Sequence, residues 1–229
     1  MSATGATNTV DFQNPIGTNA ASRTIQVDNG TASTDAILSG AISGTGGIIK
    51  TGAGLVSLTA TNTNTGITTI NAGVLSVATI GNGGPTGSLS QASNIAGNLV
   101  LGGGTLQYTG ATASTDRSYT LTNATTSFIE ITTAGTTLTI SGASANNTGG
   151  LTKIGPGTLT LSGNNLHTGT TTVSAGTLKL GAADRIANTS ALVVDGTFDM
   201  NGFSETVASL AGAGTVTSSA AGTLTYFGR

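Results

Sequence analysis

Few side chains in this sequence can do acid–base, nucleophilic or metal chemistry. The 229 residues include seven lysines and arginines, nine aspartates and glutamates, one histidine and no cysteine. The lack of cysteine excludes a thiolate nucleophile, a disulfide and a zinc–cysteine site. His167 stands between Leu166 and Thr168, and the sequence has no G-x-S-x-G segment to supply the serine of a triad. We therefore predict no catalytic residue and interpret His167 as a stacked turn residue.

The densest group of carboxylates lies near the C-terminal end of the sequence. It consists of Asp184, Asp195, Asp199 and Glu205, with Arg185 beside the first of them. Several carboxylates on one outer face, together with calcium and a basic residue, can serve the cleavage of polysaccharides. Asp195 is followed by glycine, which is typical of a turn, and Asp199 is expected on an outward face. We favour solvated exterior charges and predict no metal ligand, with a carbohydrate-active protein as an alternative.

Glycine is abundant but does not form a phosphate-binding loop. There are 36 glycines among 229 residues, about 16%, where average usage is about 7%. The sequence has no G-x-x-x-x-G-K-[ST] segment, and no G-x-G-x-x-G segment opens a helical pattern. We therefore predict no cofactor. The glycines also do not fall on every third position, which excludes collagen.

The charge content is too low for a nucleic-acid or membrane partner. Charged residues make up 7% and aromatic residues 3%, with a net charge of −2. No basic stripe is available to neutralise phosphates or to hold an anionic membrane surface. No apolar run approaches the roughly 18 residues of a membrane helix, and the first residues lack the pattern of a secretory leader. We predict no nucleic-acid binding and no membrane insertion by this segment.

Short strands with sharp turns are predicted along the whole chain. Apolar and small polar residues alternate at 136–140, 158–161 and 177–180, which indicates half-buried strands. Pairs such as Asn82-Gly83 and Ala175-Gly176 separate these segments and are typical of turns. No stretch shows sustained helical periodicity. The chain therefore belongs to the all-β class.

A long internal repeat organises these strands. Residues 47–78 align without gaps on 150–181, and the weaker flanking similarity gives a unit of nearly a hundred residues. Apolar positions such as Leu75 and Leu178 keep their character, whereas Ser76 becomes Lys179, which is an inside/outside pattern. The residues that define the motif are Lys50, Gly52, Gly54, Leu58, Asn62, Gly66, Gly73, Leu75, Lys153, Gly155, Gly157, Leu159, Leu161, Gly163, Asn165, Gly169, Gly176 and Leu178.

Short strands that recur with sharp turns predict a β-solenoid, in which each coil pairs with the next. Stacked coils place like side chains about 4.8 Å apart, so neutral threonine, serine and asparagine ladders avoid charge repulsion. We expect residues 1–22 to be an irregular or capping segment and residues 23–229 to be a single solenoid. Its long repeats are expected at about 23–116 and 117–204, with a partial third at 205–229.

The polar residues of the motif are interpreted as structural. Lys50 and Lys153 occupy one repeat position and are expected beside a turn, where a charge discourages wrong edge pairing. Asn62, Asn64, Asn164 and Asn165 are expected to form amide stacks at bends and to satisfy turn backbone groups.

The repeat resembles the passenger-associated transport repeat, also called the autotransporter-associated β-strand repeat. That pattern runs K-x-G-x-G-x-L-x-L-x-G-x-N-x-Y-x-G-x-T-x-V-x-A-G-x-L, and the segment 153–178 matches it except at His167, where the family usually has an aromatic residue. The copy at 50–75 departs further, with Ala60 in place of a glycine and Asn64 at the aromatic position. The resemblance covers about sixty residues directly.

The resemblance implies a right-handed parallel β-helix of roughly nine to eleven coils, from the passenger of a bacterial surface protein. We expect a non-enzymatic stalk or scaffold, extracellular or on the cell surface, in which the repeat aids export. Adjoining β-helix segments or a second copy stacked end to end are the expected partners, and no receptor or glycan is identified. A self-assembling extracellular fibre subunit and a carbohydrate-active β-helix are the alternatives.

Overall fold

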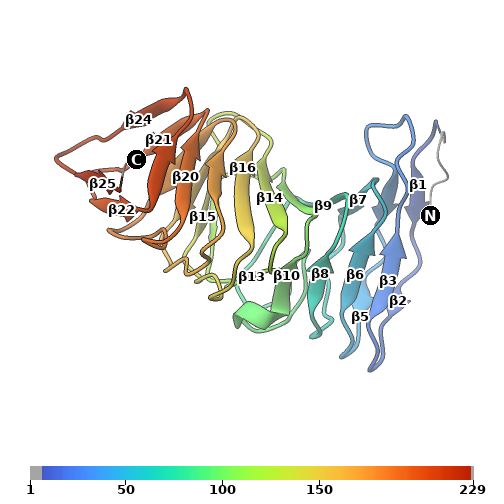
Figure 1. Cartoon of the computed structure of the whole chain (residues 1–229). Helices are drawn as coiled ribbons and strands as arrows, with labels where there is room; N and C mark the ends of the chain where they lie inside the picture. Colours follow the sequence, from blue (N-terminus) through green and yellow to red (C-terminus); the bar gives the residue numbers. More distant parts are fainter. Residues whose placement is uncertain (1–6, 228–229) are drawn as a thin grey trace.

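The computed structural model describes residues 7–227 and shows a single stack of β-coils running from one end of the chain to the other (Figure 1). Its strands fall into five sheets that run along the stack. The largest contains β1 (Val10–Phe12), β4 (Ala36–Leu38), β7 (Leu55–Leu58), β9 (Val74–Val77), β11 (Thr105–Tyr108), β14 (Thr126–Ile131), β16 (Gly150–Ile154), β18 (Thr171–Val173), β20 (Ala191–Val194) and β23 (Ser209–Ala211).

The remaining sheets form the other sides of the coils. A five-stranded sheet contains β3 (Arg23–Gln26), β6 (Ile48–Thr51), β8 (Thr68–Ile70), β10 (Leu99–Leu101) and β13 (Thr120–Leu121). A six-stranded sheet contains β12 (Ala113–Thr115), β15 (Thr137–Ile140), β17 (Thr158–Leu161), β19 (Thr177–Leu180), β21 (Thr197–Asp199) and β24 (Thr215–Thr217). The two-stranded sheets pair β2 (Ile16–Gly17) with β5 (Ile42–Ser43), and β22 (Glu205–Val207) with β25 (Leu224–Tyr226).

The predicted all-β solenoid is confirmed. Each strand of the largest sheet belongs to a successive coil, and residues 7–227 make about ten coils, within the expected nine to eleven. Neighbouring strands pair in parallel, and consecutive coils take between 18 residues (Ala191 to Ser209) and 31 residues (Val74 to Thr105). The helix assigned in residues 7–227 is the single turn η1 (Ala96–Asn98). Nothing helical in this part of the chain has both the length and the apolar character to cross a bilayer.

The core consists of ladders of buried aliphatic side chains that run through the centre of the coils. In the six-stranded sheet, Leu138, Leu159, Leu178 and Phe198 pair in register and are fully buried. The alternation of apolar and small polar residues in the sequence therefore sends one row inward from every strand. Because each inward side chain lies on its counterpart in the next coil, the core is continuous from coil to coil.

The outward row of the same sheet is a ladder of threonines. The ladder contains Thr137, Thr158, Thr177, Thr197 and Thr215, which pair in register across five coils. Their side chains alternate with the buried leucines, and the β-branched shape suits a pleated surface. These neutral side chains stack without the repulsion that a row of like charges would produce.

The segment expected to be irregular or capping contains two strands. Strand β1 pairs in parallel with β4, and β2 pairs with β5, so residues 10–17 are already part of the first coil. Residues 1–6 of the expected segment and residues 228–229 of the expected partial repeat lie outside the described residues.

The two repeat copies lie on different sides of the solenoid. In the first copy, β6 belongs to the five-stranded sheet and β7 to the ten-stranded sheet, whereas β16 and β17 of the second copy belong to the ten-stranded and six-stranded sheets. Strand β14 pairs with β11 at one edge and with β16 at the other. The second copy of the motif, 103 residues after the first, therefore lies on a neighbouring side of the solenoid.

Candidate functional site

The motif lysines lie inside the solenoid, at the glycine turns of the repeat. Lys50 is fully buried, and its Nζ donates to the carbonyl oxygens of Thr51 and Gly52 at 2.7 Å each and of Ala72 at 3.2 Å. The first acceptor is at the end of β6, the second lies in the turn between β6 and β7, and the third belongs to the turn of the next coil. The ammonium group therefore joins two successive coils at their corner.

The second copy repeats this arrangement. Lys153 Nζ donates to the carbonyl oxygens of Ile154 and Gly155 at 2.8 Å each and of Ala175 at 3.2 Å. Burial lowers the pKa of both lysines to about 8, and nearby carboxylates, among them Glu130 for Lys153, act in the opposite direction. Lys50 and Lys153 lie beside turns as expected, but the expectation that they are edge charges is wrong, because both side chains are buried and bind turn carbonyls.

The glycines beside these carbonyls are required by backbone conformation and by close stacking. Gly73 and Gly176 follow Ala72 and Ala175 and have φ values of +64° and +62°. A Cβ atom on Gly176 would also collide with the carbonyl oxygens of Gly155 and Gly157 in the preceding coil. The K-x-G-x-G segment and the later A-G pair of the motif therefore form one structural unit. It is a corner of the coil in which glycine turns stack around a lysine side chain.

The motif asparagines at 62 and 165 are buried and bind backbone groups of neighbouring coils. Asn62 accepts from the N–H of Ile42 at 2.8 Å and donates to the carbonyl of Ser88. Asn165 donates to the carbonyl oxygens of Gly163 and Arg185 at 2.9 and 3.0 Å. Both side chains therefore satisfy turn backbone groups, as side-chain amides at bends commonly do. Of the other two asparagines expected there, Asn164 is exposed and Asn64 is buried.

His167 is buried in a chain of hydroxyl groups. Its Nδ1 lies 3.0 Å from Ser144 Oγ and its Nε2 lies 3.0 Å from Thr171 Oγ1. Burial lowers the pKa of the imidazole from 6.5 to about 4, so the ring is neutral at pH 7. With both ring nitrogens bound to hydroxyl groups of its own solenoid, His167 stabilises the interior of the second repeat.

The motif leucines line the core. Leu58, Leu75, Leu159, Leu161 and Leu178 are all buried in the same continuous cluster. The remaining motif glycines, which are Gly52, Gly54, Gly66, Gly155, Gly157, Gly163 and Gly169, all stand where an added Cβ would meet atoms of an adjacent coil. Each motif position thus has a place in the packing between coils.

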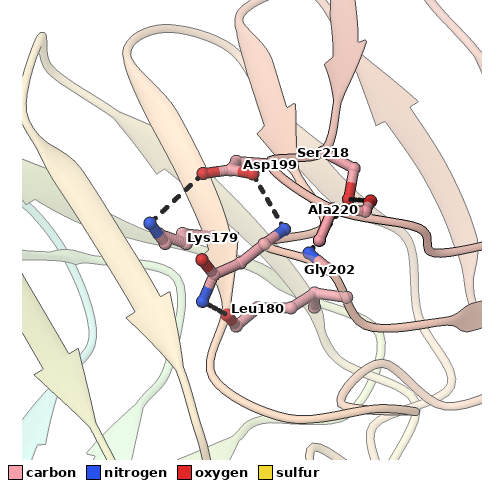
Figure 2. A network of polar contacts seen from close by, with 7 residues as sticks. Lys179, Leu180, Asp199, Gly202, Ser218 and Ala220 are labelled. Carbon is pink, nitrogen blue, oxygen red and sulfur yellow. Dashed lines mark hydrogen bonds and ion pairs between the residues drawn. The ribbon is translucent and has the colours of Figure 1, made fainter.

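The acidic group expected from the sequence is not one cluster. Asp199 lies on the outward row and forms an ion pair of 3.4 Å with Lys179 in the preceding coil, as Figure 2 shows. It also accepts from the N–H of Asn201 at 2.8 Å, which holds the turn after β21. Asp195 and Asp184 are exposed. Among residues 7–227 no three carboxylate or imidazole side chains come together as a metal site requires.

The expectation that these carboxylates are solvated exterior charges is wrong for Glu205. Its side chain is fully buried, and its carboxylate accepts from the backbone N–H groups of Arg185 and Ile186. Burial raises its pKa to about 7 against the lowering effect of these hydrogen bonds, and the nearby charge of Asp184 raises it further. The side chain holds the turn of the preceding coil rather than facing a substrate.

Two buried polar residues outside the motif were not predicted from the sequence. Arg117 donates through its guanidinium group to backbone carbonyls within the long segment between β9 and β10. These include the carbonyl of Gly81 near the start of the segment and that of Ser90 near its end. Tyr119 donates from its hydroxyl group to Asn165 Oδ1 at 2.6 Å. Both residues lie outside the segments 47–78 and 150–181 that align without gaps, so the internal alignment carried no signal for them.

The geometry defines the class of protein as a parallel β-solenoid whose coils are joined at a lysine–glycine corner. The passenger-associated-transport-repeat family model matches residues 48–77 and 151–180, which are the two segments that build this corner. The chain is also similar to a protein described as adhesin BmaC autotransporter, from Brucella suis biovar 1 (strain 1330). The two are 48% identical over 130 residues, 56% of this chain.

The chain therefore contains two passenger-associated transport repeats, as the resemblance predicted. It spans 4% of the length of the adhesin that it matches. No solved structure matches the chain.

Proposed function

We propose that the chain is a non-enzymatic structural segment of a secreted or surface-anchored bacterial passenger, located outside the cell. The observation that supports this most directly is the continuity of the solenoid, in which the ladder of the ten-stranded sheet and the aliphatic core run through about ten coils. Such a rod can hold other parts of a long chain away from a surface. The similarity to an adhesin, of which this chain covers 4%, supports the same role as one part of a longer protein.

The two ends of the rod support a position within a longer β-helix. The strands β1, β2 and β3 begin the sheets at one end, and β23, β24 and β25 end them at the other (Figure 1). Large apolar side chains are exposed at both ends, with Phe12 40% exposed at the first and Phe227 68% exposed at the last. Within residues 7–227 the outer edges of these strands pair with no further strand, and such edges with apolar neighbours are surfaces that another coil can cover. We therefore propose adjoining coils at both ends.

A surface-display experiment tests the stalk role. The 229-residue chain would be inserted between an epitope and an outer-membrane barrel that exports it, and a variant with both Gly73 and Gly176 replaced by valine would serve as the control. We expect the epitope to reach the cell surface with the unaltered chain and the insert to resist protease there, because its backbone is hydrogen-bonded from coil to coil. Periplasmic retention or rapid cleavage of the unaltered insert would contradict the proposal.

The same exposed ends favour a self-assembling fibre subunit as a second candidate. A second copy placed head to tail would cover β23, β24 and β25 with the edges of β1, β2 and β3. Filaments seen by electron microscopy, with a length that increases with protein concentration, would support the fibre. A monomeric rod at high concentration in analytical ultracentrifugation would leave the stalk segment.

The carbohydrate-active alternative has weaker support. It needs acidic side chains together on one outer face, but Asp199 is paired with Lys179 and Glu205 is buried. Activity of the unaltered chain on a polysaccharide panel with calcium, lost on Asp195→Ala and Asp199→Ala substitution, would nevertheless establish it.

A further inference from the structure

The second repeat contains a complete chain of buried hydroxyl and imidazole groups. It runs from Ser144 through His167 and Thr171 to Ser190, with separations of 3.0, 3.0 and 3.3 Å between the polar atoms. All four side chains are buried, with at most 2% of their surface exposed. Ser190 also donates to the carbonyl oxygen of Gly169 at 2.6 Å. Every member of the chain therefore has a hydrogen-bond partner within the protein.

The first repeat keeps polar side chains at the two middle positions of this chain, but no hydrogen bond joins them and the side chains at both ends are lost. Asn64 stands in place of His167 and Thr68 in place of Thr171. Ile42 occupies the place of Ser144, since its carbonyl receives the N–H of Asn64 at 3.2 Å, as Ser144 Oγ receives that of His167 at 3.2 Å. At the other end of the chain, Gly97 replaces Ser190 when β10 is aligned with β20. Neither end of the first repeat therefore has a side chain that can donate or accept a hydrogen bond.

That alignment follows from the strand pairing. Leu99 pairs with Thr68, and Leu192 pairs with Thr171, so the residues two positions earlier, Gly97 and Ser190, correspond. A Cβ atom added at Gly97 would meet no atom within 4 Å. Gly97 is exposed and has no side chain, so no hydroxyl at this position takes the part that Ser190 Oγ plays for Thr171.

Three polar atoms are left without a protein partner as a result. They are Nδ2 and Oδ1 of Asn64 and Oγ1 of Thr68, and the two residues are 0% and 1% exposed. Buried polar atoms are costly unless a hydrogen-bond partner satisfies them. The cost falls on two side chains four positions apart, at the place where the second repeat has a continuous polar chain.

We propose that this part of the first repeat is a specific binding site for ordered water, in which water bridges Asn64 and Thr68. A water molecule needs two to four polar partners in a buried position, and these two side chains offer an amide donor, an amide acceptor and a hydroxyl group. The water takes the place of the His167 ring atoms and the Ser190 hydroxyl of the second repeat. The site belongs to the first repeat alone, since the equivalent groups of the second are bonded to one another.

A double-mutant cycle tests the proposal. The variants are Asn64→Leu, Thr68→Val and the combination, with chemical unfolding of the full chain as the measurement. If water satisfies the side chains, each single variant lowers the denaturant midpoint, and the second substitution lowers it by less when the first is already present. Thr171→Val in the second repeat is the matched control, because it breaks direct protein hydrogen bonds and must lower the midpoint.

The opposite result would overturn the proposal. If the polar atoms are simply unsatisfied, apolar side chains of similar size are expected to raise the midpoint, and the two effects are expected to add. A crystal structure of the unaltered chain at high resolution gives an independent readout should a variant fail to fold. Density for water within hydrogen-bond distance of both Asn64 and Thr68 supports the site, and a dry contact between them contradicts it.

Discussion

Lys50 and Lys153 place their ammonium groups in the same setting, although 103 positions and one side of the solenoid separate them. Each Nζ donates to the next two carbonyl oxygens of its own turn and to one in the following coil, with distances that agree within 0.1 Å between copies. The motif therefore specifies a corner rather than a side of the β-helix. This explains how a repeat can recur at a spacing that is not a whole number of coils.

Removal of the corner ammonium should destabilise the chain. Lys153→Met keeps the length of the side chain but leaves three turn carbonyls without their donor, so we expect a loss of about 2 to 3 kcal/mol in the free energy of unfolding. Chemical denaturation measures the change. Lys179→Met is the control, because Lys179 is on the outside and forms a surface ion pair with Asp199, worth at most about 1 kcal/mol. Equal losses in both variants would show that the inward position has no special role.

The glycine turns should tolerate no side chain. Gly176→Ala forces a residue with a Cβ atom into a φ of +62° and against the carbonyl oxygens of the preceding coil. We expect it to lower stability by at least about 2 kcal/mol. Gly97→Ala is the matched control, since its Cβ would be free of neighbours, and it should change stability by less than about 1 kcal/mol. Thermal or chemical unfolding of both variants measures the difference, and similar melting behaviour would contradict the stacking argument.

His167 and Glu205 should give opposite pH dependences to stability. Folding lowers the pKa of His167 from 6.5 to about 4, so the unfolded chain binds more protons between these values and stability rises with pH there. Folding raises the pKa of Glu205 from 4.5 to about 7, so the folded chain binds more protons and stability falls as pH rises through that range. The two effects oppose each other between about pH 4.5 and 6.5.

Single substitutions should separate these effects. Glu205→Gln leaves the histidine contribution, so the free energy of unfolding should rise from pH 4 to 6.5 by up to about 1.4 kcal/mol per pH unit. His167→Asn leaves the glutamate contribution, so stability should fall from pH 4.5 to 7. Denaturant titrations at half-unit pH intervals give both slopes. Parallel profiles for the two variants would rule out the assignment of these groups.

The fold was predictable because two patterns in the sequence, the alternation within strands and the internal repeat, both indicate a β-solenoid. Alternating residues in strands such as β17 and β19 gave the inward row, and the internal alignment identified the glycine turns and the motif leucines. Residue type alone could not place the lysines. A charged side chain is expected on the surface, and only the turn carbonyls of two coils, brought together by stacking, make an interior position favourable.

The acidic residues show the same limit. Asp199 and Glu205 are six positions apart in sequence, yet one lies in the outward row of a strand and the other points inward from the next side of the coil. The inward position of Glu205 depends on the N–H groups of Arg185 and Ile186, which come from the preceding coil. A partner about 20 residues away in an irregular turn leaves no local pattern in the sequence.

Arg117 should control the longest coil, in which 31 positions separate the paired residues Val74 and Thr105. Its guanidinium group is buried and donates to carbonyl oxygens at two places in the segment 78–98. The acceptors are Ile80 and Gly81 near the start, and Ser90 and Ala92 in the second half. These bonds close the segment against the β-helix. Without them four carbonyl oxygens lose a donor, and the segment keeps a smaller set of hydrogen bonds, such as those of Ser88 with Asn62 and of Gly83 with Asp116.

Arg117→Met should therefore open the segment 78–98 before the rest of the solenoid unfolds. We expect the first cleavage by a broad-specificity protease to fall within it, at least about tenfold faster than in the unaltered chain, since a loss of about 1.4 kcal/mol in the local opening free energy corresponds to that factor. Mass spectrometry of the fragments gives the site and rate. Arg23→Met is the control, because Arg23 is exposed and makes one long hydrogen bond of 3.4 Å to Gly17. Cleavage of the Arg117 variant elsewhere, or at the rate of the Arg23 variant, would show that the long coil is stabilised without the guanidinium group.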